Sequence, residues 1–291
     1  MKNRSSENTI KIIKTITEMK EVIKKYKKMN LSIALVPTMG YLHKGHLSLI
    51  EKAKENNDVV VVSIFVNPTQ FGENEDYGVY PRNLERDSCL SEEAGADYVF
   101  KPSVEEIYPK GYNTYVKVEK ITDKLCGASR PGHFRGVTTI VNKLFNIIEP
   151  NRAYFGLKDA QQVLVIMKMV EDLNLSTEII PCPIIREKDG LAMSSRNVNL
   201  TKNERQIALV LSKSLFEAKD KVKAGERDLD KIVSNIKANI HNEPEITIDY
   251  VEAVNMLNLE RIKLLEGKVL IAIAVKIAKV RLIDNIILEG N

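Results

Sequence analysis

LSIALVPTMGYLHKGHLSLIEKAKENNDVVVVSIFV, residues 31–66, sets the architecture of this chain. The stretch opens with a continuous apolar run that ends at a proline, which is typical of a buried strand. Apolar residues at helical spacing follow over 45–57, and the run 59–66 indicates a second buried strand. A strand, a helix and another strand in this order are typical of a parallel β-α-β unit, so the sequence predicts an α/β fold.

Strands and helices continue to alternate on both sides of this unit. An amphipathic helix is expected over residues 10–29. Further helices are expected over 83–94, 137–148 and 160–173, and further strands over 96–102, 152–156 and 176–183. This alternation predicts a doubly wound, Rossmann-like parallel sheet with helices on both faces, in a domain that covers residues 1–185.

The composition changes after residue 185. The polar segment REKDGLAMSSRNVNLTKNE, residues 186–204, leads into helical patterns over 203–223 and 228–239. Alternating apolar runs over 246–254 and 268–288 are typical of antiparallel strands. We therefore expect a second, smaller α+β domain over residues 186–291.

Composition and charge exclude several classes of partner. The chain has 44% hydrophobic and 28% charged residues, as an ordinary globular protein does. Its net charge of +4 comes from 43 basic and 39 acidic residues spread along the sequence, so we expect neither nucleic acid nor an anionic membrane as a partner. The most apolar late run, 269–275, is far shorter than the roughly 20 residues that span a bilayer.

The start of the chain and its cysteines favour a cytoplasmic location. The opening residues, MKNRSSENTIKIIK, are polar and lack the apolar run of an export signal. The three cysteines lie far apart and show no CxxC spacing, which argues against a disulfide framework and against a zinc site. They are Cys89, Cys126 and Cys182.

The loop after the first strand holds two of the four histidines, His43 and His46. In open parallel sheets, ligands bind where strands end and loops lead into helices. A helix N-terminus there offers N–H groups to a phosphate, Gly40 and Gly45 let the backbone approach it, and the imidazoles add donors. A metal site would need more ligands than two histidines, whereas a half-buried structural pair is an open alternative.

A second candidate element is GLAMSSRN, residues 190–197. Its two serine hydroxyls and Arg196 are suited to phosphate oxygens, although such a string is also common on protein surfaces. The chain has neither GxxxxGK[ST] nor GxGxxG after a strand, so a nucleotide has to be held in another way.

The stretch FVNPTQF, residues 65–71, leaves the second buried strand and brings Asn67 and Gln70 to the same edge of the sheet. Amide side chains at that edge are suited to the hydroxyl and carboxylate of a small ligand. The alternative is that they serve the start of a helix.

Two later stretches carry polar residues of the same kind. FGLKDAQQ, residues 155–162, brings Lys158, Asp159 and Gln162 to the sheet edge, and Asp159 is also well placed to cap the following helix. RPGHFRGVTTIV, residues 130–141, fits an anion site and a structural turn equally well.

Taken together, these blocks resemble the pantothenate synthetase family, the pantoate–β-alanine ligases of the HxGH nucleotidyltransferase superfamily. PTMGYLHKGH, VSIFVNPTQF, YPR, RPGHFRGVTT, FGLKDAQQ and DGLAMSSRN occur in the family's order and at similar intervals across most of the chain. HxGH alone is a superfamily signal, whereas the ordered set is highly specific.

The resemblance implies a reaction in two steps: pantoate attacks the α-phosphate of ATP to give pantoyl adenylate and pyrophosphate, and β-alanine then displaces AMP to form pantothenate. His46 is implied as the catalytic residue. Substrate binding is implied for Gln70 and Gln162, with Asn67 and Met39 beside them. ATP binding is implied for Met39, Gly40, Tyr41, Leu42, His43, Lys44, Gly45, His46, Gly156, Leu157, Lys158, Asp159, Ile185, Met193, Ser194, Ser195 and Arg196.

The resemblance also implies Mg²⁺ and a homodimer. Asp87 matches a family position associated with magnesium, but the acidic residue often beside it is Arg86 here. Lys44 and Leu157 depart from the residues that family members often carry, at positions without a catalytic role. Mg²⁺ is then expected to be carried mainly by phosphates and water.

Charge is the obstacle to the first step, because pantoate's carboxylate is ionised at neutral pH with a pKa of roughly 4 and needs no general base. We expect His43, His46, Lys158 and Arg196, helped by the 194–195 hydroxyls, to stabilise the developing charge. The second domain is expected to close over the adenylate as a lid. The alternatives are another HxGH nucleotidyltransferase and a nucleotide-binding sensor without chemistry.

Overall fold

The computed structural model of this protein describes residues 10–73 and 75–290. These residues form two compact units. Unit 1 takes in the described residues up to Val118, then Gly132–Gly156 and Ile166–Cys182, and unit 2 takes in Glu119–Pro131, Leu157–Val165 and the described residues from Pro183 onward. Most of the polar N-terminal tail expected from the sequence falls on residues 1–9, outside the described ranges. The domain boundary at residue 185 stays a prediction.

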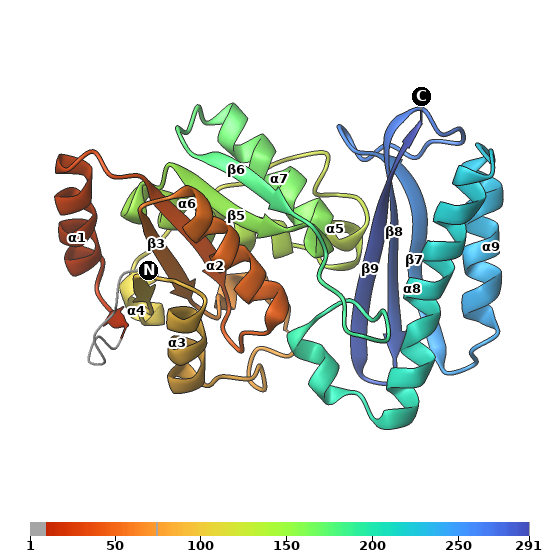
Figure 1. Cartoon of the computed structure of the whole chain (residues 1–291), viewed down its shortest axis with the longest axis horizontal. Helices are drawn as coiled ribbons and strands as arrows, with labels where there is room; N and C mark the ends of the chain where they lie inside the picture. The colour runs from red at the N-terminus through yellow and green to blue at the C-terminus, as the bar shows by residue number, and fades with distance from the viewer. Residues whose placement is uncertain (1–9, 74, 291) are drawn as a thin grey trace. The chain divides into compact units, whose positions relative to one another are not determined.

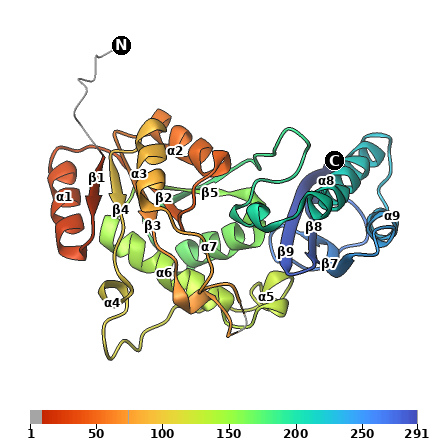
Figure 2. The ribbon, with the colours of Figure 1, turned by 90° about the horizontal axis from the view of Figure 1, so that it is seen from below.

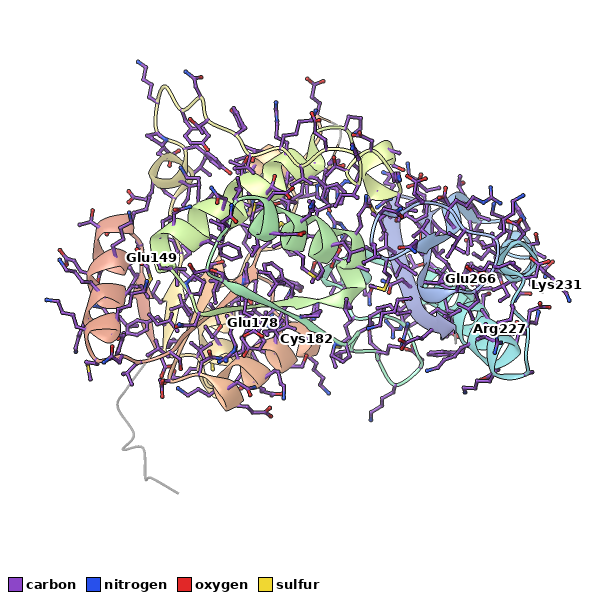
Figure 3. All side chains as sticks on the ribbon, turned by 90° about the horizontal axis from the view of Figure 1, so that it is seen from above. Glu149, Glu178, Cys182, Arg227, Lys231 and Glu266 are labelled. Atoms are coloured by element: carbon purple, nitrogen blue, oxygen red, sulfur yellow. The ribbon has the colours of Figure 1, made fainter. Side chains whose placement is uncertain are left out.

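Unit 1 is built on a parallel sheet of six strands in the order β1-β4-β3-β2-β5-β6. The strands are β1 (Lys11–Ile13), β2 (Ile33–Thr38), β3 (Val59–Ile64), β4 (Tyr98–Phe100), β5 (Arg152–Gly156) and β6 (Glu178–Cys182). Glu178 and Cys182 mark the two ends of β6 (Figure 3). The chain runs outward from β2 in both directions, so the sheet changes winding direction between β2 and β5, where such folds bind ligands.

Helices cover both faces of this sheet, as Figure 2 shows. On one face lie α2 (Lys44–Asn56) and α3 (Leu84–Glu93), whose apolar side chains pack with those of β2 and β3 in one core. On the other lies α6 (His133–Ile148), beside α1 (Ile16–Lys28). The remaining helices are the short α4 (Val104–Ile107) and α7 (Ala160–Asp172), which begins in unit 2 and ends in unit 1. The predicted doubly wound α/β fold is confirmed.

The predicted helix over residues 10–29 is wrong in its first turn. Lys11–Ile13 form the edge strand β1, which pairs with β4, and the helix α1 begins only at Ile16. Thr15 caps α1, because its hydroxyl accepts a hydrogen bond of 3.2 Å from the N–H of Glu18. Apolar spacing alone did not separate the two elements, because the partner of β1 lies about ninety residues further along the chain.

Unit 2 contains an antiparallel sheet of three strands, β7 (Ile246–Asn255), β8 (Gly267–Ile277) and β9 (Val280–Gly290). Two helices, α8 (Lys202–Lys223) and α9 (Leu229–His241), lie along this sheet and share its core (Figure 1). Unit 2 also holds the short helix α5 (Cys126–Ser129). The predicted smaller α+β part is confirmed. Across residues 10–73 and 75–290, no helix has the length and apolar character needed to span a bilayer.

Candidate functional site

The two histidines of the first loop form the N-terminal cap of α2. His43 is the cap residue, and its Nδ1 accepts a hydrogen bond of 3.1 Å from the N–H of Gly45. In return, the N–H of His43 donates to Nδ1 of His46 at 3.4 Å. The two rings stack with their centroids 4.0 Å apart. The spacing of three residues therefore produces a capping box made of two imidazoles.

This cap fixes the hydrogen positions on both rings. Because Nδ1 of His43 and Nδ1 of His46 each accept a backbone N–H, we assign the ring hydrogen of each neutral imidazole to Nε2. A phosphate at the N-terminus of α2 would then meet Nε2–H donors. The structural and the functional interpretations of the histidine pair are therefore compatible.

The turn before His43 has an unusual backbone. Gly40 has φ of +85° and Tyr41 has φ of +52°, so two successive residues lie in the left-handed region. The carboxylate of Asp87, which is 1% exposed, accepts the N–H of Tyr41 at 2.7 Å and the N–H of Leu42 at 2.8 Å. The guanidinium of Arg86 donates to the carbonyl oxygen of Leu42 at 2.9 Å. Leu42 is buried, Tyr41 and Gly45 are half-buried, and Lys44 is exposed.

Asp87 does not have the environment of a metal ligand. Each of its oxygens already accepts a backbone N–H, and Arg86 lies 3.4 Å from one of them. Within residues 10–73 and 75–290, no group of three or more His, Cys, Asp or Glu side chains is placed to hold a metal ion. The residues present do not fit a protein-bound Mg²⁺, which demands near-octahedral oxygen ligands.

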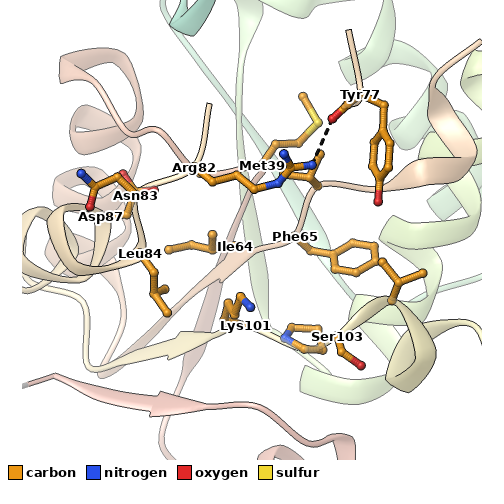
Figure 4. Close-up of a pocket in the computed structure, with 14 residues that line it drawn as sticks. Met39, Ile64, Phe65, Tyr77, Arg82, Asn83, Leu84, Asp87, Lys101 and Ser103 are labelled. Atoms are coloured by element: carbon orange, nitrogen blue, oxygen red, sulfur yellow. Dashed lines mark hydrogen bonds between the residues drawn. The ribbon is translucent and has the colours of Figure 1, made fainter. Parts of the chain in front are cut away.

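A cavity of about 290 Å³ opens at the carboxyl ends of β2, β3 and β4 (Figure 4). Met39 and Phe65 supply apolar walls, and Arg82 and Lys101 supply positive charge. Arg82 is held at the rim, because its guanidinium donates at 3.0 Å to the carbonyl oxygens of Tyr77 and Tyr80. The cavity has the mixture of apolar surface and a few cations that suits a small organic anion.

Gln70 ends the 3₁₀ helix η1 (Pro68–Gln70), and its amide donates at 3.2 Å to Sδ of Met39, which lines this cavity. The structure thus brings together two of the residues expected to bind substrate. The carbonyl oxygen of Gln70 lies 2.8 Å from Nδ1 of His133. Gly136 lets α6 approach η1, because a Cβ there would lie 2.3 Å from the carbonyl oxygen of Thr69. His133 and Gly136 of the RPGHFRG motif therefore serve this packing, as the structural alternative predicted.

The amide side chain of Asn67 is hydrogen-bonded within the chain. It is 1% exposed, and its amide donates to the carbonyl oxygen of Gly136 and to Oε1 of Gln70. Its Oδ1 accepts from Thr69 and, at 2.8 Å, from the hydroxyl of Tyr108. Burial raises the pKa of Tyr108 to about 12, so this hydroxyl keeps its hydrogen and can donate. Direct contact of Asn67 with a substrate stays a prediction, because its polar atoms serve the chain itself.

In unit 2, the predicted residues after β5 form the 3₁₀ helix η2 (Leu157–Asp159). The amide of Asn285 in β9 donates to the carbonyl oxygens of Leu157 and Lys158 at 2.9 and 3.0 Å. Asp159 lies 3.9 Å from Nζ of Lys158. Gly156 ends β5 in unit 1.

The two adjacent glutamines that follow have separate surroundings. Gln161 is buried, and its amide binds the N–H of Cys126 and the carbonyl oxygens of Ile121 and Lys124. Gln162, the one expected to bind pantoate, is half-buried. Gln161 is therefore a structural residue, and the sequence analysis assigned it no role.

The second candidate element is a hairpin that leads into the 3₁₀ helix η3 (Ser195–Asn199). Ile185 and Met193 lie opposite each other, because the N–H of Met193 donates to the carbonyl oxygen of Ile185 at 3.0 Å. Ser194 caps η3 by accepting the N–H of Arg196 at 3.2 Å, and Ser195 is buried. Both η2 and η3 pack against β9, so Lys158 and Arg196 come from elements that share one strand.

Residues that the sequence did not single out hold this hairpin. Arg186 forms a two-pronged ion pair with the buried Asp284 at 2.7 and 2.9 Å and also donates to the carbonyl oxygen of Gly190. Arg205 binds Glu187 at 2.8 Å and Asp189 at 2.6 Å. No motif marks these residues, because the ion-pair partners lie between 16 and 98 positions apart.

Comparison with known proteins gives one consistent result. A family model described as pantoate-β-alanine ligase matches residues 11–287. A pantothenate synthetase of Acetivibrio thermocellus is 61% identical over 280 residues, which cover 96% of this chain and 100% of that protein. A pantothenate synthetase of Caldicellulosiruptor bescii is 57% identical over 280 residues, which cover 96% of this chain and 99% of that protein.

Solved structures agree. The crystal structure of pantothenate synthetase from Thermus thermophilus matches with a TM-score of 0.91 at 42% identity and covers 95% of this chain and 99% of that one. Pantoate-β-alanine ligase from Francisella tularensis, crystallised with β-γ ATP and β-alanine, matches with a TM-score of 0.78 at 37% identity and coverages of 95% and 97%.

Proposed function

This chain belongs to the pantoate-β-alanine ligase family, and from that premise we propose how its residues divide the work of the reaction. The enzyme condenses pantoate with β-alanine and uses ATP as its co-substrate. The proposal concerns the steps: pantoate's carboxylate attacks the α-phosphorus of ATP, pyrophosphate leaves, and the amine of β-alanine displaces AMP from the pantoyl adenylate.

The first step needs charge stabilisation more than acid–base chemistry. A free carboxyl has a pKa of roughly 4, so pantoate is already a nucleophile at neutral pH. The attack brings an anion toward a polyanion and builds charge on the phosphate oxygens. Preorganised donors and cations are the groups that lower such a barrier.

We assign these groups to the residues that the family resemblance implied. His43 and His46 donate from Nε2 to phosphate oxygens, and the observation that carries this assignment is the use of both Nδ1 atoms in the cap of α2. Lys158 and Arg196, with Ser194 and Ser195 beside the latter, supply the other donors to ATP. Of the implied ATP residues, Ile185 and Met193 support the same hairpin by their backbone hydrogen bond.

Gln70 and Gln162 are proposed to bind pantoate, with Met39 as an apolar contact. The hydrogen bond between Gln70 and Met39, together with the adjoining cavity, supports this. Asn67 acts in this proposal by holding Gln70 through their hydrogen bond. Mg²⁺ as the ion that accompanies ATP, a homodimer, a cytoplasmic location and a closing lid all stay predictions.

Isotope transfer tests the adenylate step. Enzyme is mixed with Mg-ATP and pantoate labelled with ¹⁸O in its carboxylate, first without β-alanine and then with it. We expect pyrophosphate in the first mixture and one labelled oxygen in the AMP released in the second, because the attacking oxygen stays on phosphorus. Release of ADP and inorganic phosphate, or unlabelled AMP, would refute the adenylate.

Paired substitutions of His46 test the assignment of its two nitrogens. The amide of Asn reaches about as far as Nδ1, and that of Gln about as far as Nε2. We expect His46→Asn to keep the cap and the unfolding temperature but to slow pyrophosphate release about 100- to 1,000-fold, as removal of one oxyanion donor does. His46→Gln should retain more of the rate. The exposed His241 offers a control: His241→Asn should leave the rate unchanged. Equal rates for the two His46 variants would contradict the assignment.

A further inference from the structure

The carboxylate of Asp87 grips the turn that precedes the histidine pair. Its Oδ2 accepts the N–H of Tyr41 at 2.7 Å, and its Oδ1 accepts the N–H of Leu42 at 2.8 Å. Asp87 lies in α3, more than forty positions further along the chain, and is 1% exposed. An ionised carboxylate has about four acceptor sites, and three donors reach this one, because the guanidinium of Arg86 lies 3.4 Å from Oδ1 in addition to the two backbone N–H groups. Hydrogen bonds to a charged acceptor are about twice as strong as neutral ones.

The neighbouring Arg86 completes the grip from the same helix. Its guanidinium donates to the carbonyl oxygen of Leu42 at 2.9 Å and lies 5.2 Å from the centre of the Tyr41 ring. Two adjacent residues of α3 thus bind both polar groups of the Leu42 backbone.

The turn needs such support. Gly40 and Tyr41 have φ of +85° and +52°, and a non-glycine residue in the left-handed region costs about 1 kcal/mol or more. The fit is close, because a Cβ on Gly40 would lie 3.0 Å from Oδ2 of Asp87. His43 follows directly and caps α2, so any change in this turn displaces both imidazoles.

We propose that Arg86 and Asp87 form a clamp on the 40–42 turn, and that Asp87 is a positioning residue for the histidine pair rather than a ligand of Mg²⁺. The inference rests on the proposed role of the histidines in adenylation. It differs from the family expectation, which associates this position with magnesium. A metal ion at Asp87 would have to share a carboxylate that is 1% exposed with two N–H groups and would lie beside the positive guanidinium of Arg86, 3.4 Å from Oδ1, which repels a cation.

Asp87→Asn tests the clamp with almost no change in volume. An Asn side chain has one acceptor, so its NH₂ group would face one of the two backbone N–H groups. We expect pyrophosphate release to slow about 100-fold, as displacement of a reacting group by about 1 Å does. The KM for pantoate and the free Mg²⁺ concentration that gives half of the maximal rate should stay at the parent values. Amide hydrogen exchange at Tyr41 and Leu42 should become faster.

Asp97→Asn is the matched control. Asp97 also accepts a backbone N–H, that of Val60 at 2.8 Å, but it precedes β4 and lies at the other end of the same strands. Its substitution should leave the rate and the exchange at Tyr41 unchanged. An equal loss of rate in both variants would reduce Asp87 to a general structural residue and overturn the proposal.

A higher Mg²⁺ requirement in Asp87→Asn, with unchanged exchange at Tyr41 and Leu42, would restore Asp87 as a metal ligand. Should Asp87→Asn fail to fold, Arg86→Ala provides the same test, because it removes the bond to Leu42 and the contacts with Asp87 and the Tyr41 ring while both bonds from Asp87 to the turn remain. It should speed exchange in the turn and slow the rate. If the parent enzyme releases no pyrophosphate, the adenylation step is refuted. The exchange rates at Tyr41 and Leu42 would then still show whether Asp87 holds the turn.

Discussion

The histidine turn of unit 1 and the hairpin 185–196 of unit 2 are held in place by different forces. Backbone groups are the main partners in the turn, where Asp87 accepts two N–H groups and Arg86 binds a carbonyl oxygen. Ion pairs between side chains hold the hairpin, through Arg186 with Asp284 and through Arg205 with two acids.

Because of this difference, we expect substitutions in the turn to affect activity first and substitutions in the hairpin to affect stability first. A clamp on the backbone fixes the path of the chain itself, so small errors in it are passed directly to the residues that follow. An ion-paired hairpin depends on the charge state of side chains and on burial, and its loss first costs stability. Three substitutions, taken from the largest expected effect to the smallest, test the ion pairs of the hairpin and a close backbone contact in unit 1.

Arg186→Ala should have the largest effect on stability. It leaves the carboxylate of Asp284, whose side chain is 2% exposed, without its guanidinium, and loss of one partner of a buried pair costs about 3 to 5 kcal/mol. Urea unfolding followed by circular dichroism measures the loss. Because the orphaned charge causes most of it, the double variant Arg186→Ala/Asp284→Ala should recover stability. A double variant no more stable than the single one would show that the pair is not the main support of the hairpin.

Gly136→Ala should have an intermediate effect, in unit 1. The added Cβ would lie 2.3 Å from the carbonyl oxygen of Thr69, and overpacking of this kind costs about 1 to 3 kcal/mol. Because η1 has to move, and Gln70 with it, the KM for pantoate should rise. Gly78→Ala is the control, since its Cβ would meet nothing within 4 Å. A stable Gly136→Ala protein with unchanged pantoate KM would contradict the link between α6 and the substrate amide.

The smallest effect is expected in acid. Burial alone would raise the pKa of Asp189, but the hydrogen bond from Arg205, the backbone N–H of Leu191 and the charge of Arg205 together outweigh it, and the pKa falls below the usual 3.8. A carboxyl with a lowered folded-state pKa contributes stability above the unfolded-state value, and that contribution disappears as the pH falls through the folded-state pKa. Asp189→Asn should therefore unfold with a weaker pH dependence below about 3.8 and should lose little at neutral pH. Parallel acid-unfolding curves for parent and variant would show that this ion pair contributes nothing.

Much of the fold was accessible from local sequence. Buried apolar runs such as 33–36 and 59–62 indicated strands, because parallel strands are apolar on both faces. The long helices were indicated by apolar residues with a period of 3.6. The edge strand β1 was missed, because three residues carry too little periodicity and its partner β4 is distant. The order of motifs was specific enough to indicate the family, whose model covers residues 11–287.

The roles of individual polar residues needed the folded chain. Sequence placed Asn67 and Gln70 at the right edge of the sheet but did not tell that Asn67 is buried and bonded to Gly136. The family resemblance likewise associated Asp87 with magnesium. Only the folded chain shows that both oxygens of this carboxylate accept backbone N–H groups.

Period, composition and motif order are properties of neighbouring residues, so the chain carries them before it folds, and they settle which helices and strands form and which family they make up. The role of a carboxylate or an amide, by contrast, depends on which hydrogen-bond donors and acceptors lie next to it. For Asp87 those donors lie 45 and 46 positions away in sequence and become neighbours only when α3 packs beside the turn after β2. The role of such a group is therefore a property of the tertiary structure.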